Sequence, residues 1–144
     1  FAAMKEAGCL KVGFGLEDPD EKMRQSLDKG SIDIEACRQV MQQASDAGLS
    51  NRTYLMLGTP GQDDASIANI KDVLQTWPID ELRIAIFCPF PGTPAWNELQ
   101  GQIKVRYLAK YDTNWPVVAS HWSDDDLVDG LREIDESDEI DWKP

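Results

Sequence analysis

The sequence predicts a parallel α/β fold. Short β-rich runs alternate with helical segments of about a dozen residues, and each β-rich run is followed by a Gly- or Pro-rich cluster. Such alternation is typical of right-handed βαβ units, whose strands lie parallel in one sheet. The Gly and Pro clusters mark the carboxyl ends of the strands, where proteins with parallel sheets bind their ligands.

Three strands are expected, at residues 10–16, 53–57 and 82–87. The first alternates between apolar and small or polar residues, and the other two are short apolar runs. Three strands are too few for a closed barrel, so we expect part of a TIM-like barrel in which 10–16 pairs with 53–57. This order leaves the edge of 10–16 bare, which predicts a homo-oligomer or a cover formed by residues 107–122.

Helices are expected between the strands. The helix from Asp33 has apolar residues at a period of 3.6 and ends at Gly48, and the next begins at 63 or 64 and stops before Pro78. Shorter helical segments are expected at residues 1–7, 20–27, from Thr93, and at 123–134 behind the Ser123 capping box. Because a chain rarely begins in mid-helix, we expect a piece of a longer protein.

The chain of 144 residues carries a net charge of −12. This balance argues against a nucleic-acid partner and against an anionic membrane surface, both of which need basic patches. Ten acids and one base lie between residues 124 and 141. This acidic stretch is either a solvated helix face with a tail or a tail that binds a partner. From the strand and helix pattern we expect partial-barrel units in 1–112, and from the acidic stretch a helical, acidic extension in 113–144.

The three cysteines, Cys9, Cys37 and Cys88, are widely spaced. They match no spacing used for zinc or for an iron–sulfur cluster, so no metal ligand is assigned in this chain. Unpaired cysteines favour the reducing cytoplasm, and no apolar run approaches the ~20 residues of a membrane span. His121 is the only histidine, and its neighbour Trp122 favours a packing role.

Residues suited to ligand binding follow the strands. Glu17 ends the first strand. Its carboxylate either accepts two hydrogen bonds from a vicinal diol such as a ribose, or it is an acid at the surface or at a helix cap. Lys29, before Gly30, either binds a ligand carboxylate or is a solvated residue at a helix end. Gly58 and Pro60 form a turn that either lets a ligand approach the backbone or only starts the next helix. This turn lacks the Lys-Ser/Thr of a P-loop.

Taken in order, these blocks resemble the second half of a radical S-adenosylmethionine enzyme, with most similarity to the cobalamin-binding branch. The similarity covers about residues 1–112, and its main blocks are Gly15–Glu17, Lys29–Gly30, Gly58–Gln62 and Phe87–Trp96. In that family a partial βα barrel holds a [4Fe–4S] cluster on a CxxxCxxC loop. S-adenosylmethionine binds to the cluster and is cleaved to a radical.

The resemblance implies S-adenosylmethionine as the cofactor. It implies that Glu17 binds the ribose and that Lys29 pairs with the methionyl carboxylate. It also implies that Gly58 and Pro60 shape the pocket, and that Phe87 to Pro89 meet the adenine. The cluster cysteines are absent from this chain. A [4Fe–4S] cluster is therefore expected only in a longer protein whose N-terminal half completes the barrel, and the use of cobalamin there stays open.

The resulting prediction is a fragment of a radical S-adenosylmethionine iron–sulfur enzyme, an oxidoreductase or transferase. The fragment would supply the ribose-, carboxylate- and adenine-binding strand ends and be inactive alone, with no catalytic residue of its own. One alternative is a stand-alone α/β module that binds a nucleotide or a protein without catalysis. A purely structural oligomerisation domain is another. A CxxxCxxC motif upstream of the chain would favour the first prediction.

Overall fold

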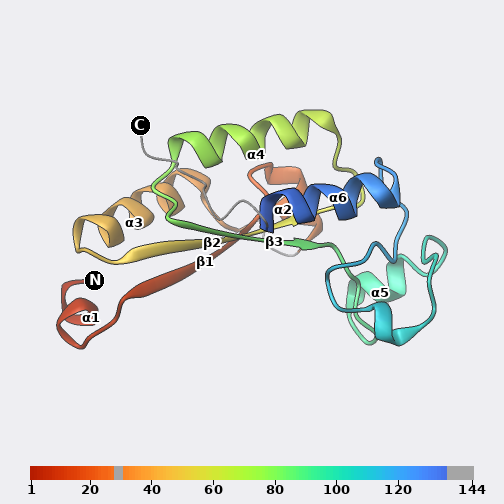
Figure 1. The fold of residues 1–144 in the computed structure, drawn as a ribbon, viewed down its shortest axis with the longest axis horizontal. Coiled ribbons are helices and arrows are strands. Elements are labelled where there is room, and N and C mark those ends of the chain that lie inside the picture. The colour runs from red at the N-terminus through yellow and green to blue at the C-terminus, as the bar shows by residue number, and fades with distance from the viewer. Residues whose placement is uncertain (28–30, 136–144) are drawn as a thin grey trace. The chain divides into compact units, whose positions relative to one another are not determined.

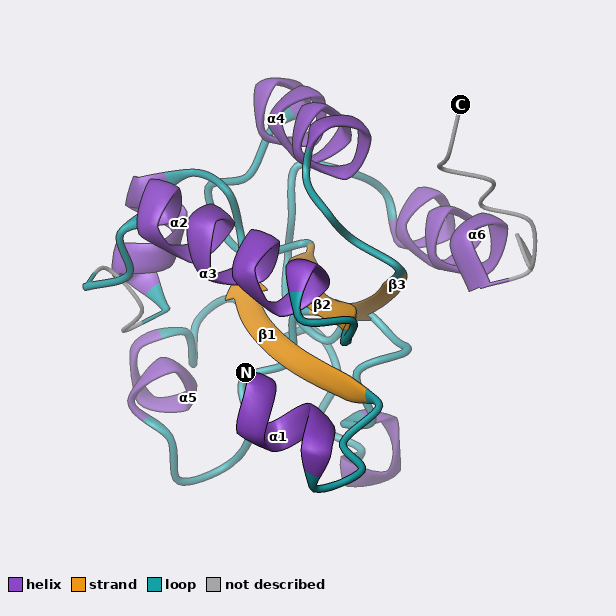
Figure 2. Ribbon diagram, turned by 90° about the vertical axis from the view of Figure 1, so that its left-hand side faces the viewer, coloured by secondary structure: helices purple, strands orange, loops and turns teal. Residues whose placement is uncertain are grey.

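The computed structural model describes residues 1–27 and 31–135. Within them, three strands form one open parallel sheet in the order β1–β2–β3. Figure 2 shows the strands side by side, with β1 at one edge. The strands are β1 (Lys11–Glu17), β2 (Ser50–Leu57) and β3 (Glu81–Ile86). The α/β class and the strand order predicted from the sequence are confirmed, and a TIM-like barrel stays a prediction.

Helices lie between and after the strands (Figure 1). Asp33 caps α3, because its side chain accepts a hydrogen bond from the backbone N–H of Ala36. Gly48 ends the same helix with a left-handed φ of 76°. The helices are α1 (Ala2–Glu6), α2 (Glu21–Ser26), α3 (Ile34–Asp46), α4 (Asp64–Thr76), α5 (Pro94–Glu98), the 3₁₀ turn η1 (Leu108–Lys110) and α6 (Asp124–Asp135).

The chain divides into two compact units. The first contains Phe1–Leu55 and Ser66–Arg83, and the second contains Met56–Ala65 and the chain from Ile84. The boundary passes through β2 and β3, so each unit holds one end of these two strands. The organisation into residues 1–112 and 113–144 stays a prediction.

The core of the first unit lies between the sheet and the two long helices. Asn51 is fully buried, and its amide nitrogen, with two N–H donors, lies 2.7–2.9 Å from three acceptors: the carbonyls of Met41 and Pro78 and the hydroxyl of Ser45. One strand residue is thereby tied to α3 and to the segment after α4. Figure 1 shows α3 and α4 on the same side of the strands. Apolar buried residues complete this core: Leu16, Met41, Ala44, Leu55, Ile70 and Val73.

The second unit gathers the ends of β2 and β3 with the C-terminal segments. An antiparallel bridge pairs Ile103 with Val118, and Val118 is buried. The backbone N–H of Ile86 donates to the carbonyl of Thr113 at 2.7 Å. Thr113, within the segment 107–122, therefore bonds to the end of β3, whereas a cover of the open sheet face by this segment stays a prediction. Across residues 1–27 and 31–135, no helix is long and apolar enough to span a bilayer.

The C-terminal helix begins as its sequence predicts. The hydroxyl of Ser123 accepts a hydrogen bond from the N–H of Asp126, and the carboxylate of Asp126 accepts from the N–H of Ser123. These reciprocal bonds form the capping box that starts α6. Leu127, one residue further on, is buried in the second unit.

Candidate functional site

The strand end at Glu17 has a strained backbone. Glu17 has a φ of 63°, a left-handed conformation that a side chain with a β-carbon rarely adopts, and the strand register shifts between Gly15 and Glu17. The N–H of Asp18 donates to the carbonyl of Leu16 at 2.8 Å, which closes a tight turn around Glu17. Such strain costs about 1–3 kcal/mol and gathers at binding and catalytic sites.

The Glu17 side chain folds back over the strand. A β-carbon placed on Gly15 would lie 3.1 Å from the Glu17 carboxylate oxygen Oε1, so a larger residue there would press the carboxylate away by a few tenths of an ångström. The next residue, Asp18, is fully buried, and its carboxylate accepts the N–H of Asp20 at 2.7 Å. The left-handed backbone of Glu17, the register shift before it and the buried Asp18 after it together fix the Glu17 carboxylate at the end of β1. Lys29, predicted from the sequence as a carboxylate ligand, lies outside the described residues.

In the second unit, the turn after β2 is braced by Gln62. The Gln62 side chain accepts the N–H of Thr59 at 3.1 Å and donates to the carbonyl of Met56 at 2.9 Å. Gly58 has a φ of 75°, and a β-carbon there would lie 3.1 Å from Leu127. The turn is therefore fixed from inside by Gln62 and covered by α6. The Thr59 hydroxyl is buried in this turn and has no hydrogen-bond partner.

The strand end at β3 lies beside this turn. The N–H of Phe87 donates to the carbonyl of Leu57 at 2.7 Å, so it is already used in joining the two strand ends. Phe87 and Pro89 are buried, and burial raises the pKa of the Cys88 thiol between them. A base bound here would therefore contact the ring of Phe87 or free carbonyl groups rather than the Phe87 N–H. Pro60 lies half-buried in the neighbouring turn.

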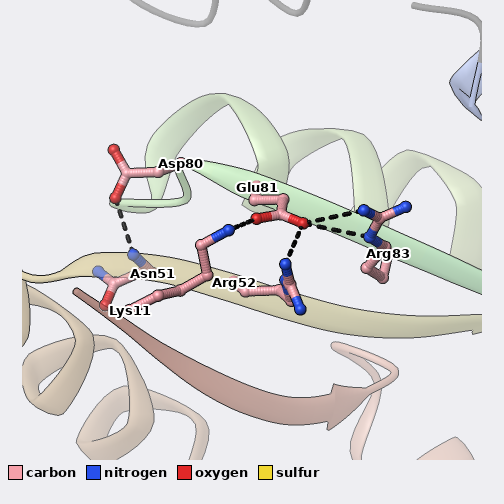
Figure 3. A network of polar contacts seen from close by, with 6 residues as sticks. All are labelled: Lys11, Asn51, Arg52, Asp80, Glu81 and Arg83. Carbon is pink, nitrogen blue, oxygen red and sulfur yellow. Dashed lines mark hydrogen bonds and ion pairs between the residues drawn. The ribbon is translucent and has the colours of Figure 1, made fainter. Parts of the chain in front are cut away.

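A charged cluster that the sequence analysis missed lies at the opposite ends of the strands, in the first unit (Figure 3). The Glu81 carboxylate pairs with Lys11 of β1, with Arg52 of β2 at 2.7 Å and with Arg83 of β3 at 3.2 Å. Hydrogen bonds from Lys11 and Arg52 lower the pKa of Glu81 to about 2. We assign the cluster a structural role, because the amino ends of parallel strands serve stability rather than chemistry. Opposite charges at the starts of three successive strands were the signal that could have revealed it.

His121 contacts an acid at the start of α4. Its Nε2 lies 3.7 Å from the carboxylate of Asp64, and the indole N–H of Trp122 donates to the same oxygen at 3.1 Å. The two rings meet edge to face, with centroids 5.4 Å apart, which agrees with the packing role predicted for His121. In the described part of the chain, no group of three or more His, Cys, Asp or Glu side chains is placed to hold a metal ion.

No family model matches the chain. Two curated relatives are similar to it. Bacteriochlorophyllide d C-12(1)-methyltransferase of Chlorobaculum tepidum is 23% identical over 107 residues, which is 74% of this chain and 24% of the relative. An uncharacterized methyltransferase of Pyrococcus horikoshii is 27% identical over 133 residues, which is 90% of this chain and 29% of the relative. The chain therefore spans about a quarter of the length of each relative.

These relatives correct the family predicted from the sequence. Both are named methyltransferases, whereas the prediction from the sequence was a fragment of a radical S-adenosylmethionine iron–sulfur oxidoreductase or transferase that lacks the cluster-binding loop. Nothing in the two names or in the described side chains supports a radical enzyme, a [4Fe–4S] cluster or cobalamin. The prediction assigned a chemistry to strand-end motifs that by themselves determine only the course of the backbone. Glycine and proline turns at strand ends fit any ligand that approaches the backbone closely.

Proposed function

We propose that this chain is the S-adenosylmethionine-binding part of a methyltransferase, and that Glu17 binds the ribose of the methyl donor. When bound, S-adenosylmethionine supplies an electrophilic methyl group. The strained backbone of Glu17 is the observation that supports this role most directly. A fold that keeps a carboxylate in a conformation costing about 1–3 kcal/mol, at the carboxyl end of a parallel strand, has a reason to place that carboxylate there.

The chemistry of Glu17 suits a ribose. A carboxylate accepts hydrogen bonds through both oxygens, and a vicinal diol donates two in the same direction. The same pairing of an acid with ribose hydroxyls recurs in dinucleotide-binding folds. The Glu17 side chain is only partly exposed, so these hydrogen bonds would form in a partly desolvated place, where they are stronger than in bulk water.

The second unit, taken by itself, suits a purine base. Gly58 and Pro60 form a braced turn, and Phe87 and Pro89 form the neighbouring strand end. Apolar side chains with nearby carbonyl groups suit an adenine, whose ring needs a flat apolar contact and an acceptor for its amino group. We propose that these residues of the second unit contact an adenine, and that the sheet is a segment of a larger α/β barrel. The unpaired cysteines fit a cytoplasmic protein.

Calorimetric titration with S-adenosylhomocysteine, the demethylated and more stable analogue, tests the proposal. Glu17→Gln keeps the shape of the side chain and removes its charge, and the Kd should rise about 5- to 150-fold, corresponding to about 1–3 kcal/mol. The control is Glu6→Gln, on the exposed surface of α1, which should leave the Kd unchanged.

Adenosine and 2′-deoxyadenosine extend this test to the ribose itself. Loss of the 2′-hydroxyl should weaken binding to the unmodified chain and have little further effect on Glu17→Gln, because the hydroxyl and the carboxylate then belong to one interaction. Additive losses would contradict the ribose assignment. Absence of S-adenosylhomocysteine binding to the unmodified chain would contradict the proposed function as a whole.

A further inference from the structure

A pocket of about 360 Å³ lies in the first unit between α2 and the start of α3. This volume is at the lower end of the range for small-molecule sites. Its lining residues are distinct from Glu17, Gly58, Pro60, Phe87 and Pro89. The described residues that line it are Glu21 and Arg24 of α2 and the stretch Ser31, Ile32, Asp33 and Ile34.

Arg24 is the unusual member of this lining, because it is a charged residue of which only 3% is exposed. Its Nη1 donates to the backbone carbonyls of Asp18, at 3.0 Å, and of Pro19. Its Nε–H is buried and has no acceptor, and within residues 1–27 and 31–135 no carboxylate pairs with the guanidinium. A buried arginine normally has a carboxylate partner, so this one has an unmet need for an anion.

The start of α3 adds to the same need. This helix has 13 residues, and its first turn borders the pocket at Asp33 and Ile34. Backbone N–H groups at a helix start carry a partial positive charge that favours an anion. Arg24 and the helix start therefore favour a carboxylate on the same ligand.

The acidic residues of the lining disfavour a ligand that carries only negative charge, such as a free phosphate. Glu21 and Asp33 are acidic, so two negative charges face the single positive charge of Arg24. Asp33 is engaged as the cap of α3 and Glu21 lies on the exposed start of α2, which leaves Glu21 as the acid suited to a cationic group. Ile32 and Ile34 supply an apolar wall. The lining thus offers one site for a carboxylate, one for a cation and an apolar surface.

We propose that this pocket binds an α-amino acid group, with its carboxylate on Arg24, its ammonium on Glu21 and its side chain against Ile32 and Ile34. The ligand is either a free amino acid or the methionyl end of S-adenosylmethionine. The second source rests on the proposed function, and the experiment below separates the two.

The first experiment titrates the ¹⁵N-labelled chain with L-methionine and records amide chemical shifts. Saturable shifts are expected at Ser31, Ile32 and Ile34. L-methioninol lacks the carboxylate and 3-(methylthio)propionate lacks the ammonium. Each should bind at least about 10-fold more weakly than L-methionine. Equal affinity for all three compounds, or shifts confined to other residues, would overturn the proposal.

Three variants identify the groups responsible. Arg24→Lys keeps the charge but loses the fork of N–H donors, and should weaken methionine binding about 10-fold. Glu21→Gln, at an exposed position that leaves the fold intact, should weaken methionine but not 3-(methylthio)propionate. The matched control is Arg38→Gln on the exposed face of α3, which should change neither. If Lys29→Gln abolishes binding and the Arg24 and Glu21 variants do not, the carboxylate is held elsewhere and the proposal fails.

The two sources are separated by S-adenosylhomocysteine and methylthioadenosine, which lacks the amino acid group. If the pocket takes the methionyl end, S-adenosylhomocysteine should bind at least about 10-fold more tightly, and Arg24→Lys should remove that advantage. Binding of both compounds with equal affinity, alongside methionine shifts in the pocket, would assign the pocket to a free amino acid. Equal affinity without methionine shifts would overturn the inference but leave the proposed function standing. Loss of both compounds would overturn the proposed function instead.

Discussion

Replacing Glu81 with glutamine should destabilise the chain in a way that depends on pH. The Glu81 carboxylate pairs with Lys11, Arg52 and Arg83, and the hydrogen bonds and charges of Lys11 and Arg52 lower its pKa from 4.5 to about 2 (Figure 3). At full strength this difference corresponds to about 3 kcal/mol of folding free energy. The Glu81 side chain is 23% exposed and its partners are more exposed, so solvent screening reduces the expected value to about 1–2 kcal/mol.

The direction with pH follows from the lowered pKa. The folded chain holds Glu81 ionised at pH values where the unfolded chain protonates it. Its contribution is therefore fully present above pH 4.5 and is lost as the pH falls toward 2. For Glu81→Gln, the deficit relative to the unmodified chain should be largest at neutral pH and should shrink over this window.

Urea unfolding and thermal unfolding, both followed by circular dichroism at pH 7 and at a series of lower pH values, measure this difference. At neutral pH the Tm should fall by about 3–7 °C for a chain of this length. The matched control is Glu35→Gln. Hydrogen bonds from Arg38 and Gln39 also lower the pKa of Glu35 to about 2, but Glu35 is exposed and its effect should be much smaller. Equal effects of the two variants, or a deficit independent of pH, would refute the reasoning.

Three further changes test the packing and the strain. Asn51→Ala removes an amide group that bonds to α3 and to the Pro78 carbonyl from a fully buried position, and should cost about 2–4 kcal/mol in urea unfolding. Gly58→Ala should cost about 1–3 kcal/mol, because φ is positive and the new methyl group meets Leu127; in a Leu127→Ala background the same change should cost less, because only the strain remains. Glu17→Gly should raise stability by about 1 kcal/mol while weakening S-adenosylhomocysteine binding, and a loss of stability would contradict the strain argument.

Much of the fold followed from local patterns in the sequence. The capping residue Asp33, the closing Gly48 and the Ser123 box act through bonds within a few residues, so their effect is readable without tertiary contacts. The order of the strands followed from short connections between successive βα units.

The start of β2 was predicted three residues late, at 53 instead of Ser50. The missed residues include Asn51 and Arg52, polar side chains that short apolar runs do not contain. Each is stabilised there by partners distant in sequence: Asn51 by α3 and the carbonyl of Pro78, and Arg52 by Glu81. Such tertiary bonds outweigh the low strand propensity of asparagine and arginine. The burial of Arg24 was not predicted, because an arginine in a short polar helix is normally solvated.

Glu17 and Glu81 show how two identical side chains on one sheet serve different ends. Glu81 stands at the amino ends of the strands, in relaxed backbone, surrounded by three cations that stabilise its charge. Glu17 stands at the carboxyl end of β1, in left-handed backbone that opposes folding. A sequence selected for stability alone would keep the first and replace the second with glycine. The retained strain at Glu17, more than its charge, is therefore the reason to assign ligand binding to the carboxyl end of this sheet.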